Sequence, residues 1–160
     1  MLGSLDWLRI WASYCRILSR AYESLFSVSA TLNSDETYRR ELHEIHTLLD
    51  QWKSSIPEHY QPGTPIRGYC LGKPVVVLIA LRIHLLYYNM LAALSRLSLY
   101  VCERDGNTEY QTQSKIRLME AARSMLNLCH LITLEAHTPT WLALIVIHLL
   151  MLMVADILSF

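Results

Sequence analysis

The sequence predicts an all-α fold, an irregular array of about five helices in a single domain. Apolar residues recur at steps of three and four along most of the chain, which is the spacing of one helix face. No segment carries a convincing strand pattern. The chain has 160 residues, of which 52% are hydrophobic and 18% are charged, which is enough for one domain with a sizeable core.

The first helix is expected from about Ser4 to Phe26, with Ser4 as its N-cap and Asp6 in its first turn. Two rows of apolar residues follow the helical spacing. One row is Leu8, Trp11, Cys15, Leu18, Tyr22 and Leu25, and the other is Trp7, Ile10, Tyr14, Ile17 and Ala21. Two adjacent rows predict a wide apolar face.

The second helix is expected from about Asp35 to Ser55, capped by Asn33 or Ser34. Its apolar residues form one narrow stripe: Tyr38, Leu42, Ile45, Leu49, Trp52 and Ile56. Pro57 ends the helix, because a proline disfavours the helical conformation of the residue before it. A long loop, Pro57–Lys73, is expected to follow. Trp52 is expected to be buried against the third helix.

The third helix, about Pro74–Val101, is apolar on nearly every side and is expected to be central. A loop is expected over Cys102–Gln113, with a turn at Asp105-Gly106-Asn107. The fourth helix is expected at about Ser114–Glu135.

A fifth helix is expected from Thr138 to about Leu158, with Thr138 as its N-cap and Pro139 in its first turn. Its segment Trp141–Ala155 carries no charge. The uncharged segment could also be read as a membrane span. It is shorter than a membrane-spanning helix and no basic residue flanks it, so a buried helix is favoured.

Charge and cysteine spacing exclude several kinds of function. Lys+Arg and Asp+Glu are each 14, so the formal net charge is zero, whereas domains that bind DNA alone usually carry a basic bias. The four cysteines are far apart: Cys15, Cys70, Cys102 and Cys129. Without a C-x-x-C pair they indicate neither a structural zinc site nor a redox motif. An intracellular, reducing compartment is favoured.

The candidate chemical groups are weak. His43 and His46 lie three residues apart and Asp50 follows, but no further ligand is convincing, so no metal is expected. His84 and His148 are expected to be core histidines. No nucleophile elbow or phosphate-binding glycine loop is present in the sequence, so we expect no enzyme and no catalytic residue.

Aromatic and methionine side chains suggest two alternatives. They either line an apolar cavity between helices or fill the core, and the core is favoured because their spacing is that of helix packing. The residues concerned are Trp7, Trp11, Tyr14, Tyr87, Tyr88, Met125, Trp141, Met151 and Met153.

Several short motifs appear in a fixed order along the chain. The helix with Leu49 and Trp52 is followed by Ile56-Pro57 and then His59-Tyr60-Gln61-Pro62. The next helix carries Leu85, Tyr87, Tyr88 and Arg96, and a later one carries Ala121-Ala122-Arg123. Upstream lie Arg16–Arg20, Tyr22 and Leu25-Phe26-Ser27. In this order the motifs resemble the C-terminal part of the fungal-specific transcription factor domain, the middle homology region of fungal binuclear zinc-cluster regulators.

The chain departs from that family at two motif positions and in one larger respect. Leu97 stands where a proline is common, and Leu118 stands where a cysteine is common. The six-cysteine zinc cluster that binds DNA in the family does not occur in these residues, so no cofactor is expected here. The resemblance also begins partway into the family's domain, which implies a truncated regulator or a stand-alone remnant.

The resemblance implies a regulatory region in the nucleus that makes no direct contact with nucleic acid. Its expected partners are the remainder of a transcription factor or other regulatory proteins, and small-molecule sensing is attributed to some members of the family. Self-association is expected as well, because the third and fifth helices are apolar on nearly every face. The alternatives kept open are a helical membrane-associated protein and a small helical enzyme acting on an apolar substrate.

Overall fold

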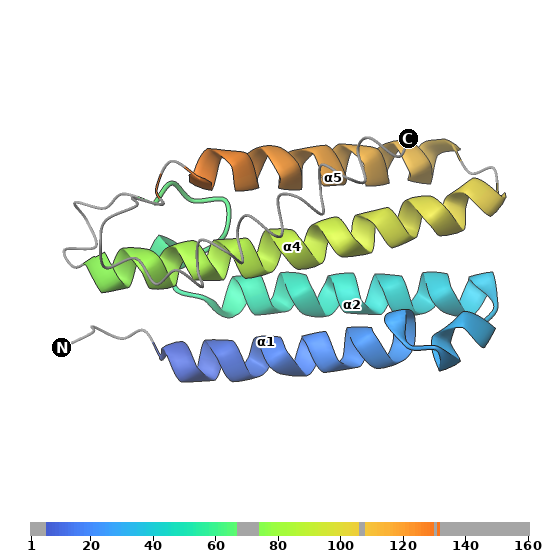
Figure 1. The fold of residues 1–160 in the computed structure, drawn as a ribbon, viewed down its shortest axis with the longest axis horizontal. Helices are drawn as coiled ribbons and strands as arrows, with labels where there is room; N and C mark the ends of the chain where they lie inside the picture. Colours follow the sequence, from blue (N-terminus) through green and yellow to red (C-terminus); the bar gives the residue numbers. More distant parts are fainter. Residues whose placement is uncertain (1–5, 67–73, 106–107, 130, 132–160) are drawn as a thin grey trace.

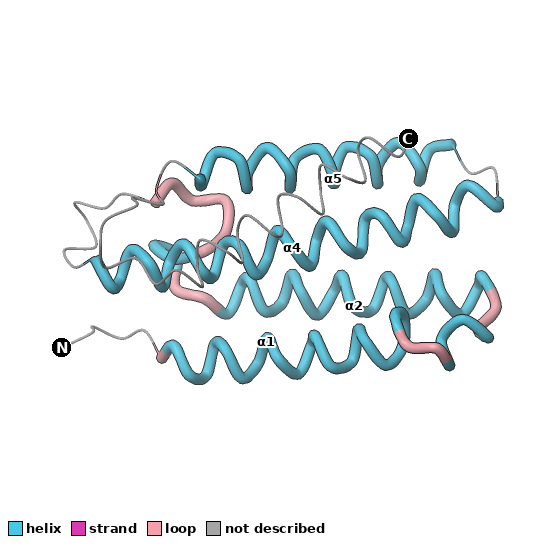
Figure 2. Tube along the Cα trace, in the orientation of Figure 1, coloured by secondary structure: helices cyan, strands magenta, loops and turns pink. Residues whose placement is uncertain are grey.

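The computed structural model describes residues 6–66, 74–105, 108–129 and 131. Four long helices lie side by side in the order α1, α2, α4, α5, and neighbours run in opposite directions (Figure 1). Their bounds are Trp7–Ala21 (α1), Asp35–Ser55 (α2), Pro74–Asp105 (α4) and Thr108–Cys129 (α5). Short helices occupy Tyr22–Phe26 (η1, a π-helix), Ser29–Leu32 (η2) and Glu58–Tyr60 (η3). The described residues contain helices and loops but no strand (Figure 2), so the predicted all-α class is confirmed.

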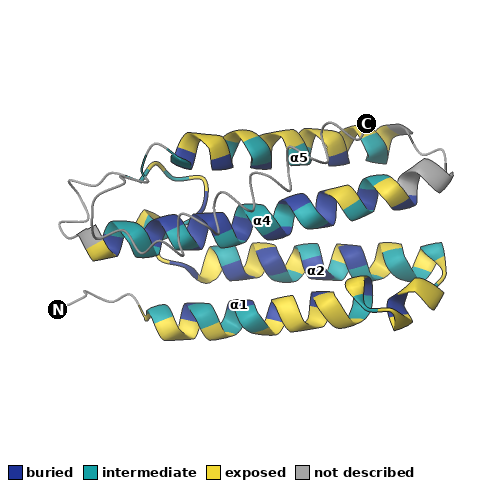
Figure 3. Ribbon diagram, viewed as in Figure 1, coloured by how far each residue is buried: buried dark blue, intermediate teal, exposed yellow. Residues whose placement is uncertain are grey.

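The start and the exposed side of α1 differ from the prediction. Asp6 is the N-cap, and its carboxylate accepts a hydrogen bond from the backbone N–H of Arg9 at 3.1 Å. The expected cap at Ser4 is therefore wrong. Within α1 the buried residues all come from the second predicted row, namely Ile10, Tyr14, Ile17 and Ala21. Leu25 of the first row is buried in η1, and Trp7 of the second row is half-buried. Much of the other row faces outward, with Leu8 75% exposed, because α1 lies at the edge of the array and is covered on one side (Figure 3).

Helix α2 has the bounds predicted from its flanking residues. The Ser34 hydroxyl accepts a hydrogen bond from the backbone N–H of Thr37 at 3.3 Å, which satisfies one of the free donors of the first turn. Ile56 at the other end is extended, with a ψ of 138°, as expected of a residue before proline. Five of the six stripe residues are buried: Leu42, Ile45, Leu49, Trp52 and Ile56.

Trp52 is buried as predicted, with 3% of its surface exposed. Its described contacts, however, lie on α1. The indole Nε1 donates a hydrogen bond to the carbonyl of Ile10 at 3.0 Å, and the ring centroid is 5.2 Å from that of Tyr14. Trp52 also shares the core cluster with Ile83 and Tyr87 of α4, the helix against which it was expected to be buried. The N–H turns the ring toward an acceptor on α1.

The predicted loop between the third and fourth helices was too long. Helix α4 continues past Val101 to Asp105, and α5 already begins at Thr108. Polar residues over Cys102–Gln113 suggested a loop, but residues 102–105 belong to α4 and residues 108–113 belong to α5. The turn at Asp105-Gly106-Asn107 lies mostly outside the described residues. Helix α5 ends at Cys129, before the predicted Glu135, and the Leu131 amide donates to the carbonyl of Leu128 at 3.0 Å in a turn.

Helix α4 is central, as its composition predicted. One core cluster joins α1, α2 and α4 and includes Ile17, Leu49 and Leu94. A smaller cluster joins α4 to α5: Leu81, Leu85, Ala92, Ala121, Met125 and Leu128. Figure 3 shows the exposed residues gathered on the outer sides of α1 and α5.

One described helix passes the length and composition test for a membrane span, namely Val75–Val101 within α4. The core helix of a soluble protein passes the same test, and 56% of the most apolar stretch of this helix is buried inside the protein. Helices α2 and α5 pack on different sides of α4, which accounts for its apolar composition. The predicted fifth helix, including Trp141–Ala155, lies outside the described residues.

Candidate functional site

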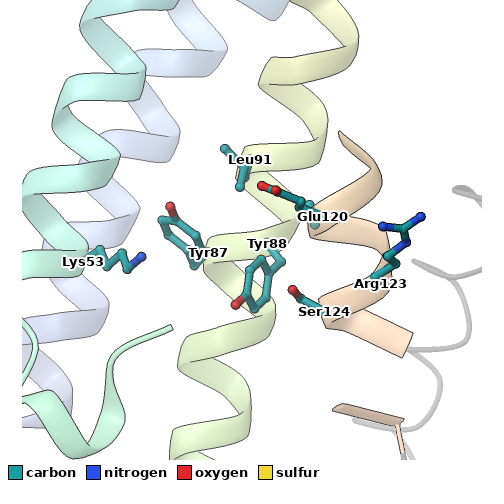
Figure 4. A pocket seen from close by; sticks show the side chains of 8 residues that line it. Lys53, Tyr87, Tyr88, Leu91, Glu120, Arg123 and Ser124 are labelled. Carbon is teal, nitrogen blue, oxygen red and sulfur yellow. The ribbon is translucent and has the colours of Figure 1, made fainter. Parts of the chain in front are cut away.

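The candidate site is an open pocket of about 380 Å³ over α4, between the end of α2 and the second half of α5. Helix α2 supplies Lys53, α4 supplies the base, and α5 supplies the opposite wall (Figure 4). The lining residues are Lys53, Tyr87, Tyr88, Leu91, Glu120, Ala121, Arg123 and Ser124. The helical periodicity explains this set: Tyr87, Tyr88 and Leu91 share one side of α4, while Glu120, Arg123 and Ser124 recur on one side of α5.

Two tyrosine rings form the base of the pocket. The rings of Tyr87 and Tyr88 meet edge to face, with centroids 5.3 Å apart. The Tyr87 hydroxyl donates a hydrogen bond to Asp50 Oδ1 at 3.4 Å. Burial, and then the nearby Asp50 carboxylate, raise the pKa of Tyr87 to about 12. This phenol is therefore neutral at physiological pH and holds its ring in place.

Charged groups stand on both sides of the tyrosines. Lys53 Nζ lies 5.1 Å from the centroid of the Tyr87 ring, within cation–π distance. Glu120 and Arg123 of α5 line the other side of the pocket, and Figure 4 shows Glu120 pointing toward the tyrosines and Arg123 pointing away from them. Within the described part of the chain, neither Lys53 nor Arg123 makes an ion pair. The pocket therefore offers two cations and one carboxylate around an aromatic base.

The two histidines of α2, His43 and His46, differ in how far they are buried. His43 is exposed, whereas His46 is half-buried. Burial, with a further contribution from Arg117 of α5, lowers the pKa of His46 to about 4. His46 is therefore neutral at physiological pH and partly covered. The residues that the structure describes contain no group of three or more side chains able to hold a metal ion.

His84 lies in the core of α4, as expected, with 2% of its surface exposed. Burial lowers its pKa to about 4, and hydrogen bonding to the backbone of Tyr60 and Gln61 opposes this in part. Its Nε2 atom has no hydrogen-bond partner among the described residues. His84 is neutral at physiological pH and does not line the pocket.

The residues of the sequence motifs do not converge on one site. Leu49 and Trp52 lie in the core, Pro57 is exposed after α2, and Arg96 is exposed on α4. Only Tyr87, Tyr88 and Ala121 meet at the pocket, while Ala122 is half-buried beside it on α5. Glu120 and Ser124 were not singled out from the sequence. Their four-residue spacing predicts that they share one side of a helix. The neighbouring sequence does not indicate which other helix that side faces.

The larger set of aromatic and methionine residues does not line a single cavity. Trp7, Trp11 and Tyr14 follow one another along α1, and the Arg82 guanidinium lies 4.6 Å from the Trp11 ring centroid. Met125 is buried between α4 and α5. Core filling is therefore the correct interpretation for Tyr14 and Met125, whereas Tyr87 is buried and also lines the pocket. Trp141, Met151 and Met153 lie outside the described residues.

The cysteines that the structure describes with their side chains are Cys15 and Cys129, and both are free and half-buried. They lie on α1 and α5, at opposite edges of the array (Figure 1). Cys70 and the side chain of Cys102 lie outside the described residues.

Curated proteins similar to this chain are fungal transcription regulators. The chain is 28% identical over 152 residues to an ABC-transporter-regulating transcription factor of Aspergillus fumigatus, a match covering 84% of this chain and 17% of that protein. It is also 28% identical over 98 residues to the protein of that description from Aspergillus oryzae, covering 61% of this chain and 11% of the relative.

A third relative is also a transcriptional regulatory protein. An uncharacterised transcriptional regulatory protein of Schizosaccharomyces pombe is 27% identical over 134 residues, covering 79% of this chain and 17% of the relative. The chain thus spans less than a fifth of the length of these relatives. No family model and no solved structure matches it. Low identity to fungal transcription factors, over most of its length, is therefore what relates this chain to known proteins.

Proposed function

We propose that the chain is a regulatory, non-DNA-binding portion of a fungal transcription factor, corresponding to the middle homology region and working in the nucleus. The observation that carries the proposal is the similarity to fungal regulators over 84% and 79% of the chain. Zero formal net charge and scattered cysteines support a role away from DNA, since DNA affinity depends on phosphate neutralisation.

The fold supports regulation through contacts between helices. Helix α5 is held mainly by α4, through the smaller of the two core clusters. Its outward side still carries large apolar residues: Ile116, Met119 and Leu126. Apolar residues gathered on one exposed side favour contact with another protein surface. The proposed partners are the remainder of a transcription factor or other regulatory proteins.

A reporter assay tests this function. The full chain is inserted between a heterologous DNA-binding domain and a constitutive activation domain, and reporter output is measured in a fungal cell. We expect output to change at least severalfold relative to the same fusion carrying Leu49→Asp, which places a charge in the core and unfolds the insert. Equal output from the two fusions, at equal protein levels, would contradict a regulatory role.

The membrane-associated alternative rests on α4 alone among the described helices. It predicts that the full chain pellets with liposomes made of neutral phospholipid. The regulatory proposal predicts that the chain stays in the supernatant without detergent. The enzyme alternative has no supporting observation, because the curated relatives are transcription regulators.

A further inference from the structure

The pocket between α2, α4 and α5 has the size of a site for a small ligand. Ligand sites in proteins have volumes of about 300–1,000 Å³, and this pocket, at about 380 Å³, is near the lower end. It admits a molecule of one or two rings. The pocket is open to solvent, so such a molecule can enter without a movement of the helices.

The base of the pocket favours an aromatic ligand. Tyr88 is half-buried and Leu91 lies one turn further along α4, so their free surfaces face the same space. Tyr87 is buried, and its hydroxyl is bonded to Asp50. Planar rings pack against tyrosine in offset or edge-to-face arrangements, which a rigid base of two rings supports.

The charges of the pocket favour an anion with a single charge. Lys53 from α2 and Arg123 from α5 flank the tyrosines, and within the described residues they have no carboxylate partner. Arg117 lies on the same side of α5 and adds positive potential, as its effect on the pKa of His46 indicates. The Glu120 carboxylate repels a second negative charge on the ligand. A ligand carboxylate gains most from this arrangement when it lies near Lys53, beside the tyrosine rings.

We propose that this pocket binds a small aromatic carboxylate, with its ring against Tyr88 and Leu91 and its carboxylate near Lys53. The inference rests on the pocket alone and stands whether or not the chain regulates transcription.

The test uses the full chain and three probes of nearly equal shape. Indole-3-acetate is anionic, indole-3-acetamide is neutral and tryptamine is cationic. Binding is followed by NMR titration of the labelled chain. We expect a dissociation constant of about 1 mM for indole-3-acetate, the range reached by small ligands in open sites. The amide should bind at least threefold more weakly and tryptamine more weakly still.

Matched variants locate the site. Lys53→Met keeps the length of the side chain and removes its charge, so the dissociation constant of indole-3-acetate should rise about three- to fivefold. Lys115→Met, at an exposed position of α5 away from the pocket, is the control and should leave it unchanged. Lys53→Gln replaces the first variant if that one does not fold. The proposal is overturned by equal binding of the three probes, by equal effects of the two lysine substitutions, or by no saturable binding up to about 10 mM.

Discussion

Truncation of Trp52 to alanine is expected to be among the most destabilising single changes in the described core. The side chain is 3% exposed, and its Nε1 atom donates to the Ile10 carbonyl at 3.0 Å. Large-to-small changes at buried aromatic positions cost about 3–5 kcal/mol, and the lost hydrogen bond adds about 1 kcal/mol. We therefore expect the free energy of unfolding to fall by about 4–6 kcal/mol, a large part of the total for a domain of this size.

Urea unfolding followed by circular dichroism measures this loss, with two variants for comparison. Tyr22→Ala removes an aromatic ring that is 62% exposed on η1, and it should cost less than about 1 kcal/mol. Trp52→Phe keeps a ring in the core but removes the N–H donor, and it should cost about 1–2 kcal/mol. If Trp52→Ala and Tyr22→Ala differ by less than about 1 kcal/mol, Trp52 is not buried as described.

A double-mutant cycle checks which helix Trp52 packs against. The ring centroids of Trp52 and Tyr14 are 5.2 Å apart, so truncations of the two residues share lost contacts. We expect the cost of Trp52→Ala combined with Tyr14→Leu to differ from the sum of the two costs by at least about 0.5 kcal/mol. Additive costs would place the main packing of Trp52 elsewhere.

Three further predictions concern pH and association. Burial raises the pKa of Tyr87 to about 12 and that of Tyr14 further, so the unfolded chain ionises first and stability falls as pH rises above 10; Tyr14→Phe should flatten this alkaline loss in denaturation at several pH values. Burial lowers the pKa of His84 to about 4, so below pH 6.5 the unfolded state binds more protons than the folded state and stability falls. His84→Leu should reduce this loss of stability between pH 6.5 and 4 by on the order of 2 kcal/mol. An acid denaturation profile unchanged by the substitution would contradict the burial of His84. Leu126 is 60% exposed on α5; Leu126→Lys should lower concentration-dependent self-association in light scattering without lowering the melting temperature.

The elements predicted best are those fixed by neighbouring residues. Helix α2 begins after Ser34 and ends before Pro57, and both signals act within a few residues of the boundary. Its stripe needed only helical periodicity. Helix α1 was harder, because two apolar rows gave no indication of which row would be covered. That choice depends on Trp52 and Tyr87, which come from distant parts of the chain.

The hairpin of α4 and α5 shows the limit of reading loops from polarity. The residues from Cys102 to Gln113 are hydrophilic, and a loop and a helix at the surface have similar composition. Helix α5 packs on the rest of the array through one side. The other sides of its first turns can therefore be polar. Helix α4 ends at Asp105 and α5 begins at Thr108, so both helices take up residues that polarity had assigned to the loop.

The pocket could not be predicted, because its residues acquire their roles from three helices together. Lys53 belongs to the polar side of α2 when that helix is considered alone, and Glu120 belongs to the polar side of α5. Helix α4 brings those sides together over Tyr87 and Tyr88, where the same charges border a volume that is partly enclosed.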